Sequence, residues 1–336
     1  MKILVDVMVE PSALVALQKT GKFEIDCLEK PAETSRPLDA ARIRDAEILF
    51  CTYPPTNFAD MKAVRWIQLA STGYTQLFGL DLPAKKIRAT NCSGCFDGPI
   101  GEWTIAMMVN LARDTRQMIR NQEAKVWDRS AIFQRELRGL TVGIWGYGGI
   151  GREVARLARL MGLKVHVLAR NGVGPRHNVY TVPGTGDPDG VLPHRVFKKG
   201  EELEFLRDLD FLVVAMPLTK TTEGLIGERE LKALPPRAFI LNPARGAIIQ
   251  EAALLQALRE KWIAGAAIDT HYKYPMPPEH PLWAFPNVIF TPHISGSSLS
   301  PYFKQRLWDI FVNNAQRFVR GEPLLNELTP AQLSGA

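Results

Sequence analysis

The sequence contains no long hydrophobic run. Although 46% of its 336 residues are hydrophobic, no apolar stretch approaches the ~20 residues that a helix needs to cross a bilayer. The N-terminal stretch MKILVDVMVEP carries Asp6 and Glu10 among its apolar residues, and no site typical of signal-peptide cleavage follows it. We therefore expect a first β-strand in place of a signal peptide, no membrane partner and a cytoplasmic protein.

Cysteine is scarce. The four cysteines are Cys27, Cys51, Cys92 and Cys95, and only the last two have the C-x-x-C spacing of a metal or redox site. No second C-x-x-C and no histidine pair completes a zinc site, and no thioredoxin-like context surrounds Cys92. The pattern favours ordinary buried or half-buried thiols over a metal or redox site, and we expect no metal.

The sequence also lacks the charge pattern of a nucleic-acid-binding protein. The formal net charge is +6 and the pI is about 9.1, but the basic residues are scattered among acidic ones. There is no basic run interleaved with aromatic residues and no helix-turn-helix pattern. We expect no nucleic-acid partner, and a mildly basic surface suits an anionic cofactor and substrate.

The apolar segments indicate an α/β protein with two doubly wound parallel-sheet domains, since 336 residues exceed one ordinary core. Short strands alternate with helices in residues 1–99, and six further strands with interleaved helices follow from residue 140. We predict one long helix from Ile100 to about Glu123 and a final helix, residues 301–320, that returns to the first domain. Residues 171–200 form a connection rich in Gly and Pro, and loops of this length are usually functional or mobile.

A glycine motif opens the second domain. The apolar run 140–145 is typical of a buried parallel strand, and Gly146-Tyr147-Gly148-Gly149-Ile150-Gly151 follows it with G-x-G-x-x-G spacing. A helical stripe and a second strand, 163–168, complete a βαβ unit. The glycines permit a tight turn, close approach of a pyrophosphate and close helix–strand packing, and the diphosphate binds at the helix N-terminus. The motif therefore predicts a dinucleotide site.

Polar and charged residues follow the later strands, where ligands of open α/β sheets bind. They are Arg245 in NPARG, Asp269, Tyr274 in HYKYP and His293 in TPH. A histidine, with an ordinary pKa of ~6.5, can give and take a proton near neutrality, and an arginine can hold a carboxylate with two hydrogen bonds. Arg245 and His293 are therefore candidate residues for binding an anion and for transferring a proton.

The motifs resemble those of the D-isomer-specific 2-hydroxyacid dehydrogenase family over almost the entire chain. The matching stretches are Asn91 with Glu102, LRGLTVGIWGYGGIG, MPLTKTTEGLI at 216–226, NPARGAIIQEAAL at 242–254, GAAID at 265–269 and PPEHPLWAFPNVIFTPHISG at 277–296. The last stretch is most similar to the glyoxylate and hydroxypyruvate reductase branch.

The resemblance implies roles for individual residues. Arg245 takes the place of the arginine that binds the substrate's carboxylate and carbonyl, and His293 that of the acid/base histidine. Thr72 and Gly73 match the backbone loop that holds the substrate carboxylate, and Asp269 matches the aspartate beside the nicotinamide amide. Further positions of the cofactor site correspond to Pro217 and Pro243.

The resemblance also implies an architecture. A Rossmann dinucleotide-binding domain, residues 100–296, is inserted in a smaller flavodoxin-like substrate domain that is built from residues 1–99 and 297–336. Family members dimerise through the nucleotide domain, so a homodimer is expected.

Tyr274 departs from the family pattern. The family's glutamate, which hydrogen-bonds the histidine and precedes a proline, is replaced here by Tyr274, and Pro275 follows it. A neutral phenol cannot stabilise an imidazolium by charge, although its hydroxyl can orient the ring. Either His293 works unassisted, or the chain has lost catalysis and binds a nucleotide only. The neutral glutamine that formate dehydrogenases of the same superfamily carry at this position favours the enzyme. His271 nearby is predicted to be a structural histidine and not a second acid.

The second departure concerns the cofactor. The acidic residue that holds the adenosine ribose in NAD enzymes is expected at the end of the second strand, where this sequence has Ala169 followed by Arg170. No carboxylate there repels a 2′-phosphate, and Arg170 can bind one; the alternative is that Arg170 is a solvated loop residue. NADP(H) is therefore the expected cofactor, with NAD(H) possible.

These features together predict an NADP(H)-preferring 2-hydroxyacid dehydrogenase that runs mainly as a 2-keto acid reductase. Two alternatives stay open. One is a non-catalytic dinucleotide sensor or partner-binding protein, and the other is a relative that acts on phosphite or formate.

Overall fold

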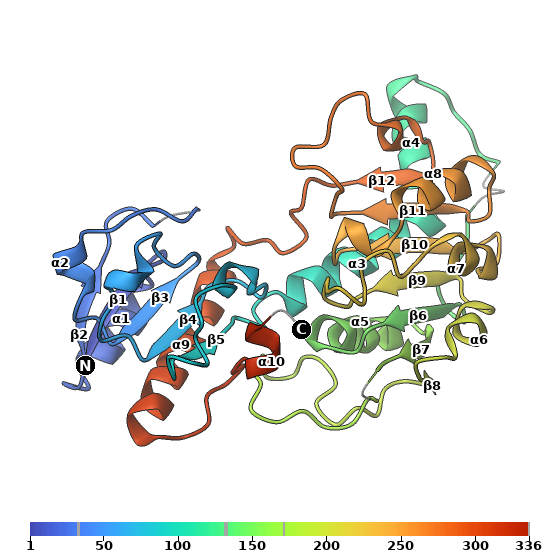
Figure 1. The fold of residues 1–336 in the computed structure, drawn as a ribbon. Coiled ribbons are helices and arrows are strands. Elements are labelled where there is room, and N and C mark those ends of the chain that lie inside the picture. The colour runs from blue at the N-terminus through green and yellow to red at the C-terminus, as the bar shows by residue number, and fades with distance from the viewer. Residues whose placement is uncertain (32–33, 131–133, 171, 335–336) are drawn as a thin grey trace. The chain divides into compact units, whose positions relative to one another are not determined.

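The computed structural model describes residues 1–31, 34–130, 134–170 and 172–334; position 171, the first of the long connection, lies outside them. The chain forms two compact units (Figure 1). Unit 1 contains residues 1–96, 177–182 and 298–336, and unit 2 contains residues 97–176 and 183–297.

Residues 177–182 lie in unit 1, although the sequence assigned them to the dinucleotide-binding domain. Hydrogen bonds to Asn326 account for the difference. The Asn326 N–H donates to the carbonyl of Asn178 (2.8 Å), and its side-chain oxygen accepts from the Tyr180 N–H (3.1 Å). The chain therefore crosses between the units four times.

Unit 1 contains a five-stranded parallel sheet in the order β2-β1-β3-β4-β5. Its strands are β1 (Lys2–Asp6), β2 (Glu24–Cys27), β3 (Ile48–Cys51), β4 (Trp66–Leu69) and β5 (Arg88–Thr90). Its helices are α1 (Pro11–Gln18), α2 (Ala40–Ile43), α9 (Pro301–Arg320) and α10 (Pro330–Leu333), with 3₁₀ turns η1 (Phe58–Asp60) and η2 (Thr75–Leu77). Residues on both faces of the sheet are buried in hydrophobic clusters, as expected for a parallel sheet.

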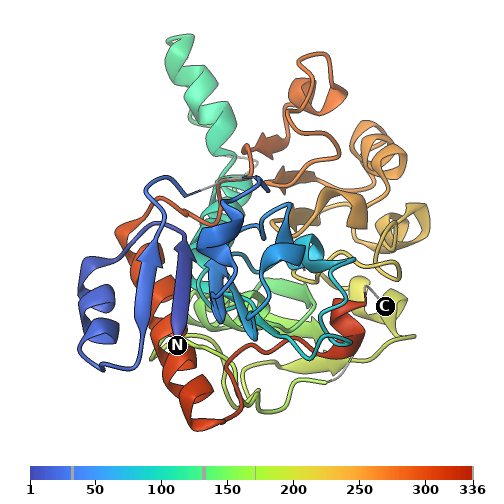
Figure 2. The same ribbon diagram turned by 60° about the vertical axis from the view of Figure 1, so that its left-hand side comes forward.

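Helix α9 closes one face of this sheet (Figure 2). Its Phe311 stacks on Phe50 of β3, with 4.1 Å between ring centroids, and on Trp66 of β4, with 5.5 Å. The local sequence defines both ends of the helix: the Ser300 hydroxyl accepts from the Tyr302 N–H, and Gly321 ends the helix in the left-handed region, at φ 70°. The final helix thus returns to the first unit, as the sequence predicts.

Unit 2 contains a seven-stranded parallel sheet in the order β12-β11-β10-β9-β6-β7-β8. Its strands are β6 (Thr141–Trp145), β7 (Lys164–Leu168), β8 (Arg195–Phe197), β9 (Phe211–Val214), β10 (Phe239–Asn242), β11 (Gly265–Ile268) and β12 (Val288–Phe290). Its helices are α3 (Asp97–Ala112), α4 (Thr115–Glu123), α5 (Gly149–Leu160), α6 (Glu202–Leu206), α7 (Glu228–Ala233) and α8 (Glu251–Arg259), with 3₁₀ turns η3 (Gly246–Ile248) and η4 (Pro281–Ala284).

Helices α3 and α5 cover one face of the unit 2 sheet, and α6, α7 and α8 cover the other (Figure 1). The strand order reverses between β6 and β9, which places the switch point of the sheet at the end of the glycine-motif strand. The expected fold class, α/β with two parallel sheets, is confirmed. No helix in the described ranges is long and apolar enough to cross a membrane.

Two elements of unit 2 differ from the prediction. The expected long helix is divided into α3 and α4 at Asp114, which has a positive φ of 46° and whose carboxylate accepts from the Gln117 N–H to cap α4. The 171–200 connection contains strand β8, which pairs with β7 and extends the sheet beyond the six strands expected. β8 is only three residues long, too short for a periodic signal.

Candidate active site

The predicted site residues of unit 2 follow the carboxyl ends of its strands. Because all paired strands of this sheet are parallel, these ends share one edge. The glycine motif follows β6, Arg170 follows β7, Pro217 follows β9, Arg245 follows β10, Asp269 follows β11 and His293 follows β12. The edge therefore gathers residues that are far apart in the sequence.

The motif glycines have the geometry that their spacing predicts. Gly146 has φ 105° and lies against β9, since a Cβ there would be 2.6 Å from the carbonyl oxygen of Ala215. Gly151 packs on the turn, since its Cβ would be 2.3 Å from the Gly146 carbonyl oxygen. A Cβ on Gly148, the N-cap residue of α5, would meet nothing within 4 Å. The site therefore has open space and helix N–H groups for a diphosphate.

The other residues of the motif pack into unit 2. A Cβ on Gly149 would lie 1.9 Å from a carboxylate oxygen of Asp97, so Asp97 occupies the space of a side chain there. Ile150 is half-buried against the α3–α5 side of the core. Tyr147 is buried, and its hydroxyl donates to the Asp187 carboxylate (2.5 Å) in the 171–200 connection. Burial and this hydrogen bond raise the pKa of Tyr147.

Arg152, which the sequence did not single out, holds the 171–200 connection to the glycine motif. It is 5% exposed, and its guanidinium donates to the carbonyls of Tyr147, Val173, Gly174 and Asp187. Its position directly after the last glycine carried no signal of this role, because the acceptors belong to a segment without periodicity. The connection is thus an ordered part of the dinucleotide edge.

The predicted cofactor residues at β7, β9 and β10 differ in exposure. Ala169 is buried, whereas Arg170 is exposed directly after it. Pro217 is exposed and its carbonyl accepts from the Thr222 hydroxyl (2.7 Å). Pro243 is buried. Arg170 is therefore the cation that unit 2 exposes at the end of β7.

Arg245 extends from a turn held by Asn242. The Asn242 side chain donates to the Arg245 carbonyl (3.0 Å) and accepts from the Ala244 N–H (3.1 Å). Gly246 follows, and a Cβ there would lie 2.7 Å from the backbone of His271, which brings the two loops together. The Arg245 side chain is exposed, and the only protein acceptor its guanidinium has among the described residues is the Ala244 carbonyl (2.6 Å). It is therefore free to bind an anion.

Asp269 holds the turn that carries His293. It is fully buried, and one carboxylate oxygen accepts from the Thr291 hydroxyl and the Ile294 N–H, the other from the N–H and hydroxyl of Ser295. Four bonds occupy the acceptor positions of the carboxylate. Its contact with a nicotinamide amide stays a prediction.

His293 has a left-handed backbone, with φ 57°, and an exposed side chain. Desolvation by the surrounding protein lowers the pKa of its imidazole, and the nearby charge of Arg245 lowers it further, whereas Asp269 opposes both. The structure thus brings the predicted anion-binding and proton-transfer groups together.

Tyr274 lies beside His293, with 5.6 Å between ring centroids. Its hydroxyl accepts from the backbone N–H of His271 (3.0 Å) and makes no hydrogen bond to His293 within the described residues. The ring of Tyr274 therefore lies beside His293, while its hydroxyl is bound by the backbone of His271.

Thr72 and Gly73 belong to unit 1 and follow β4. The Asn91 side chain donates to the Thr72 carbonyl (2.8 Å), and the Ser71 hydroxyl donates to the Gly73 carbonyl (2.7 Å). The N–H groups of Thr72 and Gly73 donate to no acceptor in the described residues. This loop therefore presents two free N–H donors.

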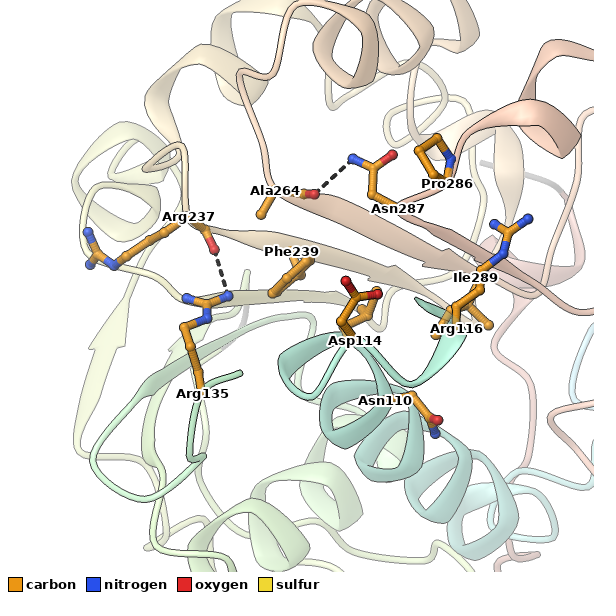
Figure 3. A pocket seen from close by; sticks show the side chains of 11 residues that line it. Asn110, Asp114, Arg116, Arg135, Arg237, Phe239, Ala264, Pro286, Asn287 and Ile289 are labelled. Atoms are coloured by element: carbon orange, nitrogen blue, oxygen red, sulfur yellow. Dashed lines mark hydrogen bonds between the residues drawn. The ribbon is translucent and has the colours of Figure 1, made fainter. Parts of the chain in front are cut away.

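A separate cavity of about 340 Å³ lies at the opposite, amino-terminal edge of the unit 2 sheet (Figure 3). Phe239, Ala264 and Asn287, which line it, stand at or before the first residues of β10, β11 and β12. Arg116 at its rim donates to the carbonyls of Phe285 and Val288. The cavity is therefore distinct from the edge that carries Arg245 and His293.

Comparison with known proteins identifies relatives of this chain. Residues 105–295 match the family model "D-isomer specific 2-hydroxyacid dehydrogenase, NAD binding domain". The chain is 31% identical over 288 residues to the glyoxylate reductase of Thermofilum pendens, covering 83% of this chain and 80% of that protein. It is 28% identical over 296 residues to the hydroxypyruvate reductase of Blautia hydrogenotrophica, covering 84% and 85%. The crystal structure of a D-isomer specific 2-hydroxyacid dehydrogenase family protein from Aeromonas salmonicida is 25% identical and superposes with a TM-score of 0.78 over 98% of both chains.

Proposed function

Since the chain belongs to the D-isomer specific 2-hydroxyacid dehydrogenase family, and is thus an NAD(P)-dependent oxidoreductase acting on CH–OH groups, we propose that it reduces small 2-keto acids and prefers NADPH. The observation that carries the proposal is that Arg245 and His293 follow β10 and β12 at one edge of the sheet, with Asp269, after the intervening β11, accepting from the Ile294 N–H beside His293. A cation and a proton donor at one sheet edge suit an anionic carbonyl substrate.

We assign the proton transfer to His293 and substrate binding to Arg245. The exposed guanidinium of Arg245 binds the substrate carboxylate and polarises the carbonyl. His293 donates a proton to the oxygen of that carbonyl as it becomes an alcohol. In unit 1, the free N–H groups of Thr72 and Gly73 are donors of the kind that binds a carboxylate.

The cofactor fits the glycine motif. The open space at Gly148, at the N-terminus of α5, suits a diphosphate. When bound, the nicotinamide supplies the hydride. Exposed Arg170, with no carboxylate at Ala169, supports NADPH over NADH.

Small keto acids are the proposed substrates because the chain's relatives include proteins named glyoxylate reductase and hydroxypyruvate reductase. The two alternatives from the sequence, a non-catalytic dinucleotide sensor and a phosphite or formate dehydrogenase, become outcomes of the test below.

A homodimer through α4 is the proposed assembly. Helix α4 has no buried residue and stands out from its unit (Figure 2). Ile119 on this helix and Trp127 after it are exposed, Trp127 by 89%. Exposed apolar side chains gathered on one segment are typical of a protein–protein interface, and the cavity beside α4 offers a further surface for a partner.

The test is a panel of 2-keto acids from glyoxylate to phenylpyruvate, assayed with NADPH and NADH in parallel. Arg245→Ala should raise KM and lower kcat, and His293→Ala should lower kcat by about 10²–10⁴-fold, while NADPH fluorescence still reports binding. His177→Ala is the control, because His177 is an exposed histidine of unit 1. Tight NADPH binding without any turnover would favour the sensor, and turnover restricted to formate or phosphite would favour the other alternative.

A further inference from the structure

The backbone of His293 lies in the left-handed region, which is uncommon for a residue with a side chain. A residue with a side chain rarely adopts a φ near 57° unless neighbouring contacts hold it there. One contact is local: the His293 N–H donates to the carbonyl of Thr291 (3.0 Å). Asp269 accepts hydrogen bonds from Thr291, Ile294 and Ser295, on either side of His293. Its carboxylate cannot donate to the Thr291 carbonyl, so any second donor to that carbonyl comes from another group.

His271 supplies a second donor to that same carbonyl. Its Nε2 lies 2.7 Å from the Thr291 oxygen. A carbonyl oxygen can only accept, so Nε2 carries the hydrogen, and in the neutral ring Nδ1 is left with a lone pair. The Thr291 carbonyl therefore joins the backbone of His293 to the side chain of His271.

The rest of the His271 ring makes apolar contacts. The ring is 7% exposed and stacks on Phe290, with 4.0 Å between centroids and an interplanar angle of 17°. Its Nδ1 has no hydrogen-bond partner in the described residues. An unpaired buried acceptor is unfavourable. A phenyl ring would fill the same space without leaving one. The contribution that requires an imidazole here is therefore the Nε2 hydrogen bond to Thr291.

The ring of Tyr274 lies near the rings of both histidines. Its hydroxyl accepts from the His271 N–H (3.0 Å), and its ring lies 5.8 Å from the ring of His271 and 5.6 Å from that of His293. His271 is thus held by its backbone to Tyr274 and by its side chain to the turn of His293.

We infer that His271 is a positioning residue for His293: it fixes the Thr291 carbonyl and so keeps the His293 turn in the conformation from which the imidazole donates its proton. The inference rests on the proposed role of His293 as the acid. The chain has Tyr274 where the family has a glutamate, and in this inference buried His271 contributes to positioning His293.

The experiment compares His271→Phe with His271→Gln. Phenylalanine keeps the stack on Phe290 and loses the donor, whereas glutamine keeps an N–H donor of similar reach. We expect His271→Phe to lower kcat for keto-acid reduction about 10- to 100-fold, with KM and the NADPH dissociation constant within about twofold of the unmodified protein. His271→Gln should recover most of the lost kcat.

Hydrogen exchange of residues 291–295 gives a readout that does not depend on turnover. The Ile294 and Ser295 amides should exchange faster in His271→Phe and near the original rate in His271→Gln. Unchanged kcat and exchange in His271→Phe, or equal losses in both variants, would overturn the inference. Absence of turnover in the unmodified protein would instead overturn the proposed function, and the exchange data would still decide the positioning role.

Discussion

The surroundings of His293, the proposed proton donor, disfavour its charged form. Desolvation and the charge of Arg245 lower its pKa; buried His271 acts in the same direction, and only Asp269 opposes them. The neighbouring side chain of Tyr274 is a phenol and not a carboxylate. A group with a lowered pKa loses its proton at a lower pH, so the charged donor is present only below the ordinary histidine value of ~6.5.

We therefore expect kcat/KM for keto-acid reduction to fall as pH rises through a range below the ordinary histidine pKa of ~6.5. Tyr274→Glu should move this limb to higher pH, because a carboxylate beside the ring stabilises the imidazolium. Tyr274→Phe is the matched control: it removes the hydroxyl that binds His271 and adds no charge, so the limb should stay in place. A limb above pH 8 in the unmodified protein, or one that Tyr274→Glu leaves unmoved, would contradict this account.

Arg170 is the residue on which the proposed cofactor preference depends. Loss of a charge-assisted contact with the 2′-phosphate is worth about 1.5–3 kcal/mol, so Arg170→Ala should reduce the NADPH-over-NADH ratio of kcat/KM roughly ten- to hundredfold. Arg207→Ala is the control, because Arg207 is an exposed arginine just before β9, at the opposite edge of the sheet. Equal efficiency with both cofactors in the unmodified protein would refute the preference.

At the scale of elements, α4 is a helix that contributes no buried residue to the core of unit 2. None of its residues is buried, although Met118 and Ile119 on it are apolar. Most helical stability in proteins comes from packing of an apolar face, so α4 needs a surface to pack against. A second copy of the chain provides one in the proposed homodimer.

Replacing Ile119 by Glu together with Trp127 by Ala should convert the dimer to a monomer, since both changes remove apolar area from the proposed interface. Sedimentation velocity over a range of concentrations measures the outcome. Leu160→Glu is the control, because Leu160 at the end of α5 is also exposed, by 71%. A monomeric unmodified protein, or a double variant that stays dimeric, would rule out this interface.

The sequence predicted the elements whose signal is local. The strands that flank the glycine motif are short apolar runs, and the motif itself has fixed spacing, so both could be placed without a structure. The division of the long helix could not, because it depends on the left-handed backbone of Asp114 within a helical apolar stripe. β8 could not either, because a three-residue strand becomes visible only through its pairing with β7.

The candidate site divides in the same way. Arg245 and His293 belong to recognisable motifs at strand ends, and the structure brings them together. The hydrogen bonds of Tyr147 to Asp187 and of His271 to Thr291 join residues 40 and 20 positions apart. No spacing rule predicts such contacts, so the supporting residues of the site could be assigned only from the fold.

At the scale of the whole molecule, the two units are interleaved along the chain. The strands of unit 2 all lie within residues 141–290, whereas unit 1 needs its first five strands, residues 177–182 and helix α9. Each unit has its own hydrophobic clusters. Unit 2 is therefore nearly continuous along the chain, whereas unit 1 is complete only when α9, near the C-terminus, has been synthesised.

This interleaving has a consequence for the growing chain on the ribosome. At about 5–20 residues per second, the roughly 200 residues between β5 and α9 take on the order of 10–40 s to synthesise. Throughout that interval Phe50 and Trp66 lack Phe311, the α9 residue on which both stack. Domains usually fold in the order of their synthesis, but here the second unit can be complete while the first still exposes an aromatic face. At this stage the nascent chain would carry a folded dinucleotide-binding unit together with an exposed aromatic face of unit 1, which chaperones can bind.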